Sequence, residues 1–144
     1  MTKHISEAAI VDLATRALDA TLPKSEWNHA AHFALALWCF RHRPQLAEPE
    51  PMRSIITRLN EAHGTPNTDS EGYHHTITCA SLRAAGAVHD NVPAEVPLNM
   101  VLSDLLAGPF GRSGWILEYW TEGRLFSVEG RRDWIEPDRA PLPF

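Results

Sequence analysis

Apolar residues recur at helical spacing in the first part of the chain. Over residues 5–22 they lie three and four positions apart with charged side chains opposite, which predicts an amphipathic helix that Pro23 stops. Residues 27–41 are apolar almost all round, so we expect the buried centre of a bundle there. Ser25 is the predicted N-cap of this second helix, and Pro44 closes the segment.

Three further helices are predicted in the middle of the chain. Residues 51–63 begin with a proline suited to a first helical turn and are followed by Gly64, a typical residue just past a helix end. Residues 73–89 contain no proline and carry apolar side chains at helical spacing. Residues 97–107 again begin with proline, and Gly108 follows them.

The C-terminal part of the sequence is broken into shorter pieces. Residues 115–121 and 127–135 predict two short helices, the second with Ser127 as its N-cap, before a proline-rich tail over residues 136–144. No run alternates apolar and polar residues well enough to predict a strand. We therefore expect an all-α fold: one compact domain of four to six helices over residues 1–144, with an extended C-terminal tail.

Composition narrows the class of protein. The chain has 144 residues, of which 44% are hydrophobic and 22% charged, as in ordinary globular domains. Its net charge of −5, with no basic run longer than the Arg131–Arg132 pair, argues against a nucleic-acid partner. No signal peptide and no apolar run of about 20 residues is visible, so we expect a cytoplasmic protein without a membrane partner.

Histidine and cysteine are the residues with metal-binding or acid–base chemistry. The two cysteines, Cys39 and Cys79, are too few for a disulfide framework, and we interpret them as reduced core residues. The chain has eight histidines, and His29 and His32 lie three residues apart, on one face of a predicted helix. Such a pair can share a metal ion, although histidines held only by hydrogen bonds are the commoner explanation of the spacing.

A second histidine pair starts another predicted helix. His74 and His75 point about 100° apart if helical, so only one of them should face a common centre. If the helices over 27–41 and 73–89 pack together at their N-terminal ends, His29, His32 and His74 form a three-nitrogen metal site with open positions. Zinc fits such a site best, and iron, manganese or copper would also be accepted.

Several polar residues near these histidines are candidates for supporting roles. His75 and Tyr73 are the candidates for proton transfer, with an exposed histidine and an interfacial tyrosine as the simpler explanations. Asn60 and Asn67 are candidates for substrate binding, although each could instead cap a helix end or tie down the loop, and we favour the structural role for Asn67.

The motifs themselves resemble a family of small bacterial proteins of unassigned function. The similarity covers WNHAAH, the segment from Asn60 to Thr78 that contains GYHHTIT, and the C-terminal stretch with RLFSVEGRR and PDRAPLP. It implies His29, His32 and His74 as the site histidines, with polar companions listed here: Asn60, Asn67, Thr68, Tyr73, Thr76 and Thr78. From this set we add Thr78 to the candidate substrate-binding residues. His75 departs from the family pattern, which has glutamate there.

The sequence thus leads to two functional hypotheses. The first is a metal-dependent enzyme that acts on a small molecule, by hydrolysis or a lyase-type step with zinc, or by oxygen chemistry with iron or copper. The second is a non-catalytic small-ligand-binding or helper protein, with a structural metal or a metal-free histidine pocket. Its apolar helices would also allow a homodimer.

Overall fold

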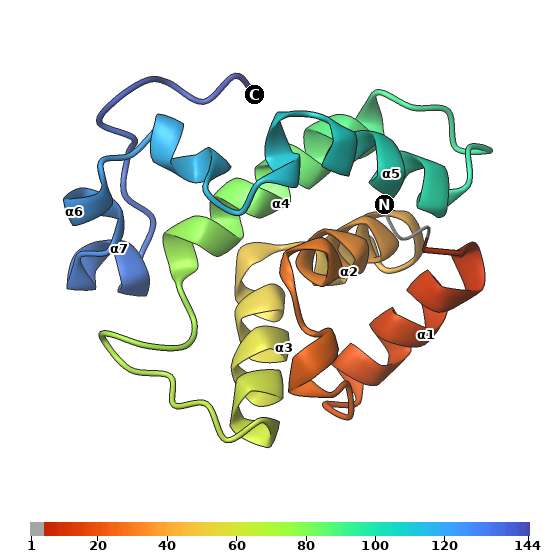
Figure 1. The fold of residues 1–144 in the computed structure, drawn as a ribbon, viewed down its shortest axis with the longest axis horizontal. Coiled ribbons are helices and arrows are strands. Elements are labelled where there is room, and N and C mark those ends of the chain that lie inside the picture. The colour runs from red at the N-terminus through yellow and green to blue at the C-terminus, as the bar shows by residue number, and fades with distance from the viewer. Residues whose placement is uncertain (1–4) are drawn as a thin grey trace.

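The computed structural model describes residues 5–144, which fold into a bundle of helices (Figure 1). The longer helices are α1 (Glu7–Leu18), α2 (His29–His42), α3 (Pro49–Ala62), α4 (His75–Asp90) and α5 (Leu98–Ala107). The short ones are α6 (Glu122–Leu125) and α7 (Val128–Arg132), and the 3₁₀ turns are η1 (Lys24–Glu26), η2 (Pro44–Leu46), η3 (Pro109–Gly111) and η4 (Trp115–Glu118). No strand forms among the described residues, which confirms the all-α prediction.

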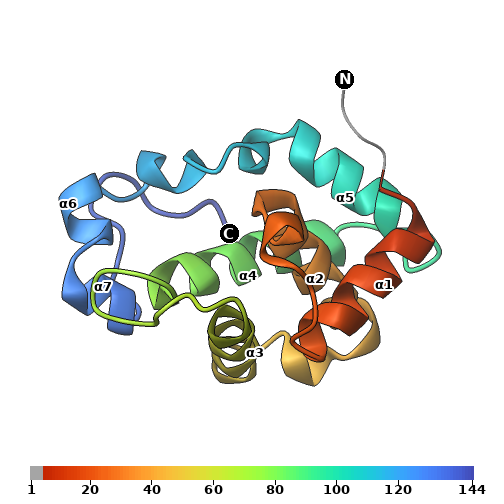
Figure 2. The same cartoon turned by 60° about the horizontal axis from the view of Figure 1, so that its bottom comes forward.

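Helix α2 is the centre of the bundle, as its apolar sequence predicts. It packs against α1, α4 and α5, while α3 packs against α4 and α1 (Figure 2). Its middle is buried on all sides, from Phe33 through Leu37 to Cys39. Within residues 5–144 no helix is long and apolar enough to cross a membrane.

The connection from α1 to α2 differs from the prediction. Helix α1 ends at Leu18, because Ala20 adopts a left-handed φ of 58° and turns the chain away three residues before Pro23. Ser25 is not the N-cap of α2: it lies inside η1, and the chain stays non-helical through Trp27. Asn28 caps α2 instead, with its side-chain oxygen accepting a hydrogen bond from the Ala31 N–H at 2.9 Å.

Helices α3 and α4 begin at other residues than predicted. Helix α3 begins at Pro49, two residues before Pro51, since a proline in the first turn needs no N–H partner. Gly64 follows its end with a φ of 74°, as predicted. Helix α4 begins at His75 rather than at residue 73, because the imidazole of His74 acts as its N-cap.

The segment with α6 and α7 lies beside the start of α4 (Figure 1). The predicted helix over 115–121 is only the 3₁₀ turn η4, and the one over 127–135 is limited to α7, capped by Ser127 as expected. The buried hydroxyl of Thr76 lies 2.7 Å from the Gly130 carbonyl and 2.8 Å from that of Asp133. These contacts dock the C-terminal segment on α4. Residues 136–144 form no helix or strand, in keeping with the predicted tail.

Candidate functional site

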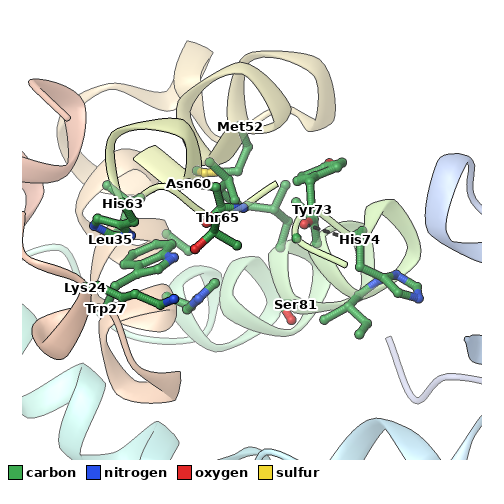
Figure 3. A pocket seen from close by; sticks show the side chains of 17 residues that line it. Lys24, Trp27, Leu35, Met52, Asn60, His63, Thr65, Tyr73, His74 and Ser81 are labelled. Carbon is green, nitrogen blue, oxygen red and sulfur yellow. Dashed lines mark hydrogen bonds between the residues drawn. The ribbon is translucent and has the colours of Figure 1, made fainter. Parts of the chain in front are cut away.

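A cavity of about 380 Å³ opens between α2, α3 and the first half of α4 (Figure 3). Its wall is largely apolar, with Leu35, Met52 and Ile56 contributed by α2 and α3. Polar side chains interrupt this wall, namely Lys24, His32, Asn60, His63, Thr65, Tyr73, His74, Thr78 and Ser81. An apolar hollow with a few inward polar groups is the usual form of a small-molecule site.

His32 is one of the polar residues that border this cavity. Its ring stacks on Trp27, with the centroids 3.8 Å apart and the planes 26° apart. Neither ring nitrogen has a hydrogen-bond partner among residues 5–144, and the side chain is exposed and borders the cavity. Loss of hydration in the surrounding protein, helped by the nearby His29, lowers the pKa of His32 to about 4. At neutral pH the ring therefore offers one N–H donor and one bare nitrogen acceptor.

His29 lies outside the cavity, although it is only three residues from His32. Its Nε2 is 2.7 Å from the carbonyl oxygen of Phe110, and its ring meets Phe33 edge to face. A carbonyl can only accept, so this nitrogen carries the proton. No hydrogen bond engages the other ring nitrogen, Nδ1, among the described residues, so shared ligation by His29 and His32 stays a prediction.

His74 borders the cavity, but both of its ring nitrogens are engaged elsewhere. Nδ1 accepts a hydrogen bond from the Ile77 N–H at 3.2 Å, and Nε2 donates to the Leu125 carbonyl at 2.6 Å. In Figure 3 its imidazole extends away from Trp27 and His63. Burial is the main cause that lowers the pKa of His74 to about 4. The ring is thus a neutral helix cap and a tie to α6.

The three predicted metal ligands do not come together. His29 and His74 bond to different carbonyls, and His32 borders the cavity. Within residues 5–144, no group of three or more histidine, cysteine, aspartate or glutamate side chains converges in a way that could hold a metal ion. A metal on His74 would have to displace the Ile77 N–H from Nδ1, whereas His29 could offer Nδ1 and keep its carbonyl partner. Zinc, iron, manganese or copper binding stays a prediction from the sequence.

The candidate substrate-binding residues have two kinds of role. Asn60 and Thr78 border the cavity, whereas Asn67 holds the loop between α3 and α4. The Asn67 side-chain oxygen accepts from the Asn60 amide and from the Tyr73 N–H, both at 3.0 Å, and its amide donates to the Thr57 carbonyl. This is the structural role favoured for Asn67, and it fixes the side of the cavity formed by the loop.

The two candidates for proton transfer form a buried pair. Tyr73 Oη and His75 Nδ1 are 2.7 Å apart, and the other ring nitrogen, Nε2, is 3.4 Å from the Cys79 sulfur. Tyr73 borders the first cavity, while His75 and Cys79 border a second one, of about 670 Å³. Burial raises the pKa of Tyr73 to about 12, so the phenol is protonated at neutral pH.

Sequence reasoning missed three contributors to these sites. Trp27 and Cys79 were taken as core residues, and His63, whose Nε2 donates to the Leu22 carbonyl at 2.6 Å, had no assigned role although it borders the first cavity. One signal was present for Cys79: it follows His75 by four residues, and this spacing brings side chains together on a helix. For Trp27 and His63 the sequence contains no comparable signal.

No family model, curated protein or solved structure matches the chain. The resemblance of its motifs to small bacterial proteins therefore stays a prediction, and the functional argument depends on the geometry.

Proposed function

We propose that the protein binds a small, mostly apolar molecule in the cavity between α2, α3 and α4, and that His32 is the main polar contact. The observation that carries this proposal is an imidazole beside the cavity with no protein partner for either nitrogen. The side chain is exposed, so water occupies both bonding positions until a ligand that supplies one acceptor and one donor replaces it.

Charge and neighbouring groups define the ligand further. The cavity lining contains no aspartate or glutamate and one lysine, Lys24, while its histidines His32 and His74 are neutral because their pKa values are lowered to about 4. His63 also borders the cavity, and its Nε2 donates to the Leu22 carbonyl. A molecule without positive charge, with an apolar ring and an amide or hydroxyl group, complements these features.

Ligand-observed NMR with small aromatic amides, benzamide among them, tests the proposal. The informative variant is His32→Phe, which keeps a ring against Trp27 but removes both nitrogens. We expect it to weaken binding about tenfold, the effect of losing one or two hydrogen bonds. His42→Ala is the matched control, because His42 is an exposed histidine of the same helix that does not border the cavity. Equal binding by both variants would refute the role of His32.

The metal-dependent enzyme is the competing proposal, and elemental analysis separates it from the metal-free pocket. The protein is purified without a histidine tag, and metal is counted per chain in the parent, in His32→Phe and in His29→Ala. Near-stoichiometric zinc, iron, manganese or copper that both variants lose would favour the metal-dependent reaction. A parent that takes up none of these ions would favour the metal-free pocket.

A further inference from the structure

Side-chain contacts link Cys79 through His75 to Tyr73 at the start of α4. The Cys79 sulfur is 3.4 Å from His75 Nε2, and His75 Nδ1 is 2.7 Å from Tyr73 Oη. The imidazole therefore lies between the thiol and the phenol.

Both ring nitrogens of His75 are thus in contact with a neighbouring side chain, and the tautomer sets their roles. With the proton on Nδ1, the ring donates to the Tyr73 oxygen, and Nε2 is bare and faces the Cys79 thiol. This is the tautomer in which His75 can accept the thiol proton.

Both members of the Cys79–His75 pair rest in their neutral forms. Burial raises the pKa of the Cys79 thiol, and burial together with the charge of Arg53 lowers the pKa of His75. At rest the pair is therefore a thiol and a neutral imidazole rather than a thiolate and an imidazolium. The Glu50 carboxylate, 4.0 Å from His75 Nε2, is placed to stabilise the imidazolium that would form.

The second cavity gives small molecules a route to this sulfur. His75 and Cys79 lie in its wall beside Arg83, whose guanidinium is held 4.1 Å above the centre of the Trp134 ring. Cys39 provides the contrast: it is fully buried, it borders neither cavity, and no imidazole contacts its sulfur among the described residues. Of the two cysteines, only Cys79 has both an imidazole in contact with its sulfur and a cavity through which a small molecule can reach it.

We propose that Cys79 is a nucleophile for small carbon electrophiles, such as α,β-unsaturated carbonyl compounds, that enter the second cavity, with His75 as its base. In this step a sulfur electron pair forms the S–C bond at the β-carbon while the thiol proton moves to His75 Nε2. The electrons of the C=C bond shift to the α-carbon, which then takes that proton from Nε2. The net reaction adds S–H across the double bond and returns the imidazole to its neutral form.

Timed labelling with N-ethylmaleimide, an electrophile of this class, tests the proposal. Peptide mass spectrometry measures the rate at Cys79 and at Cys39 in the folded protein, and each rate is divided by that of the same residue in the urea-unfolded chain. We expect Cys79 to react at least about a hundredfold faster than Cys39 on this scale, since general-base assistance is typically worth 10²–10⁴-fold. Equal protection of the two cysteines would overturn the proposal.

Variants of the chain separate chemistry from packing. His75→Ala should slow labelling of Cys79 at least about tenfold, and added imidazole should restore part of the rate because it fits the space left by the side chain. A residue that only packs would show no such rescue. Tyr73→Phe keeps the ring and removes the acceptor for Nδ1–H, so it should slow labelling less than His75→Ala does.

Far-ultraviolet circular dichroism checks that each variant is folded. If His75→Ala fails to fold, His75→Gln, which retains volume and polarity, takes its place in the rate comparison. An unchanged Cys79 rate in a folded His75 variant would show that the imidazole is not the base.

Discussion

The N-terminal ends of α2 and α4 use similar residues in different ways. Both carry histidines near the first turn, and in both the pKa of one histidine, His32 or His74, is lowered to about 4. Helix α2 is capped by Asn28, which leaves the imidazole of His32 without a protein partner beside the cavity. Helix α4 is capped by His74 itself, so both nitrogens of that ring serve the fold.

This difference shows that a histidine motif does not define a role. A side chain whose nitrogens are bonded within the protein stabilises the native state, whereas one with bare nitrogens beside a cavity can bind a ligand. The comparison therefore predicts large stability effects at His74 and small ones at His32.

The largest effect is expected for His74→Ala. This substitution removes the α4 cap and leaves the buried Leu125 carbonyl without its donor, so we expect a loss of about 3 kcal/mol in the free energy of unfolding. Urea denaturation measures it. His74→Asn is the control, because asparagine can still cap the helix and should recover about 1 kcal/mol. A loss below that of an ordinary surface substitution would mean that His74 is not a structural residue.

The next effect is a pH dependence of stability. The unfolded chain protonates His74 near its ordinary pKa of 6.5, whereas the folded protein does so only at about 4. Stability is therefore complete above pH 6.5 and falls as the pH drops toward 4, by up to about 3 kcal/mol. Urea denaturation at several pH values should give a shallower slope for His74→Asn than for the parent.

The smallest effects concern the first turn of α2. Asn28→Ala removes the side-chain cap and should lower the free energy of unfolding by about 1 kcal/mol. His32→Phe removes no hydrogen bond within the protein and should change it by less than about 0.5 kcal/mol. Thermal and urea denaturation of the two variants side by side tests this order. A larger loss in His32→Phe than in Asn28→Ala would reverse the assignment of roles.

Local sequence patterns predicted most of the helices and some of their ends. The apolar run of α2, the stop at Gly64 and the Ser127 cap all depend on neighbours within a few residues, and the structure confirms each of them. The errors at Ser25 and at the start of α4 have the same origin. Several residues there can cap a helix, and the choice between them depended on contacts outside the segment.

The sequence by itself determined the helical class, the buried centre and which histidines lie near one another along the chain. Only the tertiary structure decided which imidazoles remain available, because their partners are distant: the Phe110 carbonyl lies 81 residues from His29, and the Leu125 carbonyl lies 51 residues from His74. Every residue offers a carbonyl, so no local pattern marks the ones that receive these bonds. Packing brings them within reach, and thereby separates a ligand-binding histidine from a structural one.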